Sequence, residues 1–111
     1  MTVTVKVLVP AKNVENSQTT QYTATGVTAI IDKFTATNYS AVAATISVYL
    51  VTVSGSEGNL NLITKTKTLQ PAEVYTFPEL VGQVLGVGDF ISTAASTGSA
   101  INMRVSGREV T

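Results

Sequence analysis

The feature that most constrains the fold of this chain is a strict alternation of apolar and polar residues in two runs between Ile30 and Val53. In the second run one face carries Ala44, Ile46, Val48 and Leu50, and the other carries Thr45, Ser47, Tyr49 and Val51. Successive side chains of a strand point to opposite sides of a sheet, so this period of two predicts half-buried antiparallel strands. The turn-forming residues Asn38-Tyr39-Ser40 lie between the runs and predict a pair of strands joined there, to which the other strands are added.

The N-terminal segment also alternates, because Thr2 to Val9 reads TVTVKVLV. Its four valines are expected on one side of a strand, namely Val3, Val5, Val7 and Val9. Pro10 is expected to end this strand, since proline has no N–H to donate to a neighbouring strand. Residues 1–10 are therefore expected to form either an edge strand of the domain or an arm that pairs with another subunit, and both alternatives stay open.

Further strands are expected at 18–24, 60–69, 74–77, 89–95 and 100–110, between turns rich in glycine, proline and small polar residues. In the last of these, Ile101, Met103 and Val105 should face inward, and Gly107 should form a bulge or permit a close contact. About eight strands at spacings of roughly 8–12 residues predict an all-β fold, an antiparallel β-sandwich of either the jelly-roll or the immunoglobulin-like type.

One short helical turn is expected near 78–85 (PELVGQVL). Proline suits the first helical position, and Glu79 suits the positive end of a helix dipole. The apolar residues that follow have helical spacing: Leu80, Val81, Val84 and Leu85. Gly82 lies in the middle of the segment and favours a single turn over a longer helix.

Length and hydropathy fit a single domain spanning residues 1–111. Hydrophobic residues make up 44% of the chain, yet no apolar run approaches the ~20 residues that a membrane-spanning helix needs. No positively charged segment followed by an apolar run is visible at the start, so no signal peptide is expected. The sequence therefore predicts a chain that is made in a cytoplasm without export and has no membrane partner.

The residue types that carry most catalytic chemistry are missing, since the chain has 0 histidines and 0 cysteines. These two residues supply the commonest general base, the thiolate nucleophile and the commonest transition-metal ligands. The 7 acidic residues are scattered singly, and no loop has the spacing of a calcium site. The formal net charge is +0 with no cluster of basic residues, so nucleic acid is not an expected partner. The sequence predicts no catalytic residue, no cofactor and no metal, and hence no enzyme.

A low content of charge, 13% of all residues, suits a protein that packs against other protein subunits. Faces rich in valine and threonine would leave apolar area exposed in a monomer, which predicts a homo-oligomer, with a trimer favoured. The candidate interface residues are Val3, Val5, Val7, Tyr39, Tyr49 and Tyr75. The same three tyrosines are the candidates for stacking on a sugar.

Three segments carry a family resemblance: FTATNYSAVAATISVYLV followed by SG, LQPAEVYTFPELVGQVLGVGDFIS, and SAINMRVSGREVT. Together they resemble small β-sandwich virion proteins of tailed bacteriophages, over residues 27–111. The block PELVGQVL with the following GDFIS is the more particular part of the likeness.

The resemblance implies a non-enzymatic structural subunit, present in many copies and assembled into the virion in the host cytoplasm. The first hypothesis is a capsid decoration or cement protein that stabilises the head through contacts with the major capsid protein or other virion proteins. The alternative is a neck, tail or fibre component, including a module that binds carbohydrate or the host surface.

Overall fold

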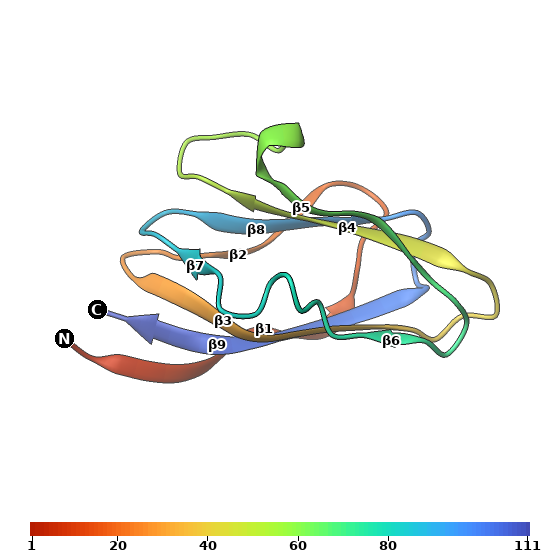
Figure 1. The fold of residues 1–111 in the computed structure, drawn as a ribbon, viewed down its shortest axis with the longest axis horizontal. Helices are drawn as coiled ribbons and strands as arrows, with labels where there is room; N and C mark the ends of the chain where they lie inside the picture. The colour runs from red at the N-terminus through yellow and green to blue at the C-terminus, as the bar shows by residue number, and fades with distance from the viewer.

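In the computed structural model, which describes all 111 residues, two antiparallel sheets pack face to face (Figure 1). Sheet A has the order β1 (Val3–Asn13), β9 (Ile101–Val110), β3 (Thr28–Asn38) and β6 (Val74–Tyr75), with β7 (Val84–Leu85) also paired to β3. Sheet B has the order β2 (Thr19–Thr23), β8 (Phe90–Ala95), β4 (Ala44–Val51) and β5 (Leu62–Leu69). A 3-10 turn, η1 (Asn59–Asn61), lies in the connection between β4 and β5. None of the elements is a helix of the length and apolarity that crossing a bilayer requires.

The strand pairing is that of a jelly roll, which confirms the β-sandwich and decides between the two types. Both β6 and β7 pair with β3, so they act as one interrupted strand. The pairs are then nested: β1 with β9, β2 with β8, β3 with β6 and β7, and β4 with β5. Strand β9 also pairs with β3, which completes sheet A, and strand β8 also pairs with β4, which completes sheet B.

In β9 the core between the sheets follows the alternation read from the sequence. Ile101, Met103 and Val105 of β9 are buried, whereas Asn102 and Arg104 between them are exposed, as predicted. Near the β6 side of the core the centre of the Phe77 ring lies 4.5 Å from the centres of the Phe34 and Tyr75 rings. Burial of these side chains against both sheets is what holds the layers together.

The expected pairing of the two central strands is wrong. Strand β3 belongs to sheet A and β4 to sheet B, so the connection at 39–43 is an arch from one sheet to the other. Asn38 shapes this arch: its fully buried amide donates to the carbonyls of Val42 and Leu69, at 2.9 Å each. Its Oδ1 accepts from Ser40. A buried amide with such partners replaces the hydrogen bonds that a hairpin turn would have formed.

Pro10 does not end the first strand, because β1 continues to Asn13. Proline is tolerated there since β1 is an edge strand and the register to β9 shifts between Val9 and Lys12. A second shift, between Val7 and Val9, also alters the expected faces: Leu8 and Val9 are both buried. Val9 therefore lies on the opposite side of the strand from the three preceding valines, as a β-bulge requires. Of the two alternatives for residues 1–10, the isolated chain shows an edge strand.

No helical turn forms at 78–85, where one was expected. The segment makes two tight turns, with the Leu80 N–H bonded to the Phe77 carbonyl and the Gln83 N–H to the Leu80 carbonyl. Val84 and Leu85 then pair with β3 as the short strand β7. The apolar residues divide between core and surface, since Leu85 is buried and Val84 is 58% exposed. Pairing with the edge of β3 satisfies backbone groups that a helix would have satisfied internally.

The two chain ends lie side by side at one end of the sandwich (Figure 1). Thr2 and Thr111 exchange both backbone hydrogen bonds, at 3.1 and 2.9 Å. In the middle of sheet A, Gly107 permits the close contact expected from the sequence, because a Cβ there would lie 2.1 Å from the carbonyl oxygen of Ile30.

Candidate functional site

The strongest candidate for a functional surface is the outer face of sheet A, the side turned away from sheet B. On β1 it begins with Val3, Val5 and Val7, which are 52%, 84% and 39% exposed. These valines alternate with Thr4 and Lys6, so they share one side of the strand. The structure therefore brings together three of the residues that the sequence suggested for an interface.

Neighbouring strands extend this apolar row across the sheet. Val110 of β9 lies opposite Val3, and Ile30 of β3 lies on the same face because it pairs with Arg108, which also pairs with Val5. Val84 of β7 pairs with Ile30 in turn. Directly paired residues project to the same side of a sheet, so these side chains form one patch near the chain ends.

A single ion pair lies within the apolar part of this face. The Arg108 guanidinium contacts both carboxylate oxygens of Asp32, with Nη2–Oδ1 at 2.9 Å and Nε–Oδ2 at 3.0 Å. The hydrogen bonds that Arg108 donates to the Asp32 carboxylate raise the pKa of Arg108. Both side chains are more than 40% exposed, so the pair contributes little to stability and is available to a partner surface.

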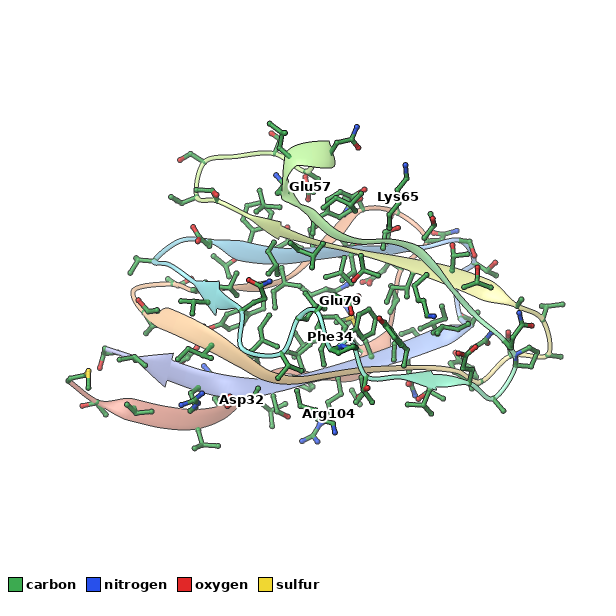
Figure 2. All side chains as sticks on the ribbon, in the orientation of Figure 1. Asp32, Phe34, Glu57, Lys65, Glu79 and Arg104 are labelled. Atoms are coloured by element: carbon green, nitrogen blue, oxygen red, sulfur yellow. The ribbon has the colours of Figure 1, made fainter.

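The middle of the same face is basic. Lys33 lies opposite Ser106, and Arg104 lies opposite Thr35. Neither Lys33 nor Arg104 is part of a salt bridge, in contrast to Arg108. Figure 2 shows Arg104 and Asp32 projecting from the lower sheet away from the core. The face thus combines an apolar patch with two unpaired positive charges, which suits a protein surface that carries carboxylates.

The three candidate tyrosines lie in separate places and form no common platform. Tyr39 is 52% exposed in the arch, and its hydroxyl donates to Asn13 Oδ1 at 2.8 Å. Tyr49 is half-buried on β4 in sheet B. Tyr75, on β6, packs against Phe77. A sugar that stacks on several aromatic rings would need neighbouring rings, and the fold does not bring these together.

Tyr75 instead belongs to a polar cluster that ties the two sheets together, and that sequence reasoning missed. Its hydroxyl donates to Glu79 Oε1 at 2.7 Å, and the Thr64 hydroxyl of β5 donates to Oε2. The ammonium of Lys67 lies 4.7 Å from the centre of the Tyr75 ring. Glu79 lies 15 positions after Thr64 and no local motif links the two residues, so the cluster has no signal in the sequence. Figure 2 shows Glu79 between the sheets.

The charge of Glu79 is fixed by these contacts. Burial alone would raise the pKa of its carboxyl, but the hydrogen bonds from Thr64 and Tyr75 and the charge of Lys67 together hold that pKa below its ordinary value. The hydrogen bond to Glu79 raises the pKa of Tyr75 to about 12. Both carboxylate oxygens accept hydrogen bonds from side chains of the protein, so the arrangement is one that stabilises the sandwich.

A second polar cluster closes the opposite side of the sandwich. Lys12 donates to Glu15 at 2.8 Å and to Gln21 at 2.7 Å, and Gln21 donates to Glu15 and to Thr93. The hydrogen bond from Lys12 lowers the pKa of Glu15. No buried side-chain nitrogen or oxygen in the structure lacks a hydrogen-bond partner. The side chains of this second cluster therefore link sheet A to sheet B through hydrogen bonds.

The surface has no pocket, and no three His, Cys, Asp or Glu side chains lie close enough together to share a metal ion. No family model, curated protein or solved structure matches this chain.

Proposed function

We propose that the protein is a non-enzymatic structural subunit of a tailed-bacteriophage virion, assembled in the host cytoplasm. Its role is to decorate or cement the capsid, with the outer face of sheet A bound to the major capsid protein or another virion protein. The observation that carries the proposal is the composition of that face: an exposed apolar patch beside two basic side chains without salt-bridge partners. Exposed apolar patches of this kind mark protein–protein contact sites.

The dimensions of the molecule fit this role. The sheets are stacked vertically in Figure 1, which looks down the shortest axis, so the outer face spans about 46 Å along the strands and 20 Å across them. A standard interface uses about 800 Å² from each partner. Nearly the whole face is needed to supply that area, so a subunit would lie flat against its partner, with sheet B turned away from it.

The jelly-roll order of the strands is compatible with the proposal. The same architecture is found in viral capsid and lectin domains, although a fold alone does not specify a function. The resemblance of residues 27–111 to small virion proteins adds the tailed-bacteriophage setting. The exposed face adds a surface with which such a subunit could bind a particle.

The location of the chain in the intact particle tests the proposal. Cryo-electron microscopy should show a two-layered density of this size at repeated positions on the head, and that density should be missing from particles made without the gene. Density confined to the neck, tail or fibres would support the alternative role instead. Particles with no such density anywhere would refute both.

Surface variants then test which face binds. Arg104→Glu and Val84→Asp each change an exposed side chain on the outer face of sheet A, so they should lower the number of copies bound per particle without changing the fold. Lys65→Glu is the matched control, because Lys65 is exposed on β5 and projects from the other sheet (Figure 2). Equal loss of binding in the control would show that the face has been wrongly assigned.

A further inference from the structure

The free edge of β1 is the only sheet edge in the molecule that is regular enough to pair with another strand. A two-sheet sandwich of this order has four edges: β1 and the interrupted strand β6–β7 in sheet A, and β2 and β5 in sheet B. Unpaired edges bind other strands unless bulges, proline or short length prevent it. Each of the other three edges has one of these features.

The interruptions are specific. Strands β6 and β7 have two residues each and are separated by turns that include Pro78. Strand β2 has a register shift between Thr20 and Tyr22. Strand β5 contains Thr66 with a left-handed φ of 44°, and its register against β4 shifts twice. By contrast, Val3 to Val7 pairs with β9 without any shift.

At the valines of this segment, the backbone N–H and C=O groups point away from β9, toward the open edge of the sheet. Thr2 and Thr111 exchange both hydrogen bonds, and in an antiparallel ladder such pairs alternate with pairs that exchange none. Thr4 and Lys6 therefore bond to β9, while the N–H and C=O groups of Val3, Val5 and Val7 point to the open edge. No element of the protein covers them, since β1 pairs only with β9.

The segment is self-complementary when two copies run antiparallel. With Val5 opposite Val5 of a second copy, Val3 lies opposite Val7, and Thr4 lies opposite Lys6. Valines then meet valines on the outer face, and no charge lies directly opposite a like charge. Lys6, the one charged residue in the segment, already forms an ion pair with Glu109 at 3.3 Å on the other face of the strand.

We propose that a second copy of this chain binds at the free edge of β1, with Val3–Val7 of the two copies paired antiparallel about a two-fold axis at Val5. Sheet A of each copy then becomes half of one continuous sheet, and the two outer faces form a single surface twice as wide. A strand that pairs with its own copy closes the assembly at two subunits. A trimer built by strand pairing would need a second regular edge, which the chain does not offer, so the edge geometry favours a dimer over the trimer suggested by the sequence.

Charge-swap variants of Val5 test the pairing in the isolated chain of residues 1–111, without any virus particle. Sedimentation equilibrium over a concentration series should give a mass that rises from one chain to two. Val5→Lys and Val5→Glu each place like charges face to face on the axis and should weaken dimerisation about tenfold. An equimolar mixture of the two variants should restore it. Val5 is 84% exposed, so the thermal unfolding of the monomer should be unchanged.

Val42→Lys is the matched control, because Val42 is 68% exposed and belongs to the arch, which lies at the end of the sandwich opposite the chain ends (Figure 1). It should dimerise like the unchanged protein. Hydrogen exchange gives an independent measurement: the amides of Val3, Val5 and Val7 should be protected at high concentration and unprotected in Val5→Lys. A single-chain mass at millimolar concentration, a three-chain mass, or a dimer that Val5→Lys and Val5→Glu leave intact would each overturn the proposal.

Discussion

Replacing Gly107 with alanine should destabilise the fold strongly, although it adds only one methyl group. Gly107 lies on β9 opposite Ile31, at the point where the register of β3 shifts by one residue. That shift brings the carbonyl oxygen of Ile30 to 2.1 Å from the position of an alanine Cβ, and Leu8 Cδ1 to 2.9 Å. Ordinary contact begins near 3.4 Å. The obstructing atom belongs to the backbone of a central strand, so a side-chain rotation cannot relieve the clash.

The size of the effect follows from the displacement required. Strands β3 and β9 would have to separate by about 1 Å at this point, which stretches the adjacent ladder hydrogen bonds beyond their useful range. Loss of about two such bonds at about 1 kcal/mol each, with about 1–3 kcal/mol for overpacking, gives a destabilisation of about 3–5 kcal/mol. For a domain of this size that corresponds to a fall in Tm of about 12–20 °C.

Urea unfolding of the purified variants measures this directly, with circular dichroism as the readout. Gly58→Ala is the matched control: Gly58 has an extended φ of −173° and no atom lies within 4 Å of its added Cβ, so its free energy of unfolding should change by less than about 0.5 kcal/mol. If Gly107→Ala were within about 1 kcal/mol of the unchanged protein, the description of this contact would be incorrect.

Three further predictions concern charged side chains. Glu79→Gln should lower the free energy of unfolding by about 1–2 kcal/mol, because an amide cannot accept both hydrogen bonds that the carboxylate accepts; an unchanged urea midpoint would contradict this. The pKa values of Glu15, Glu79 and Glu109 are all lowered, so their contribution to stability is complete above pH 4.5 and is lost as the pH falls below it. Calorimetry should therefore show a Tm that is steady near neutral pH and falls below pH 4.5, and a Tm that rises there would refute the assignment. Asp32→Asn should leave the Tm nearly unchanged, since its ion pair with Arg108 is exposed, and a large loss would indicate a role in packing.

The local part of this fold could be predicted from the sequence, because apolar and polar residues that alternate along a strand show which side chains share a face. That alternation predicts the buried face of β9, and a glycine inside the strand predicts the close contact at Gly107. The choice between jelly roll and immunoglobulin-like sandwich could not be made, since it depends on pairings such as β1 with β9 between opposite ends of the chain. The false pairing of β3 with β4 has the same cause, because turn-forming residues also suit an arch.

Bulges account for the remaining errors within single strands. An extra residue at Leu8 moves Val9 to the buried side, and no residue in the segment TVTVKVLV predicts that register shift. For the candidate surface, the sequence identified Val3, Val5 and Val7 but not the neighbours that complete it. Val84 and Ile30 lie more than 50 positions apart and meet only because β7 pairs with β3. What the surface binds is not encoded in any local motif.

The meeting of the chain ends has a practical consequence for engineering. Since Thr2 and Thr111 are hydrogen-bonded to each other, a linker of a few residues could connect them without stretching either strand. The chain could then be reopened at the exposed Gly58, beside η1, to give a circular permutant with the same pairing order. Cargo fused at residue 1 or residue 111 would leave from one corner of the molecule (Figure 1), whereas cargo fused at Gly58 would leave from above sheet B, so the direction of display could be chosen.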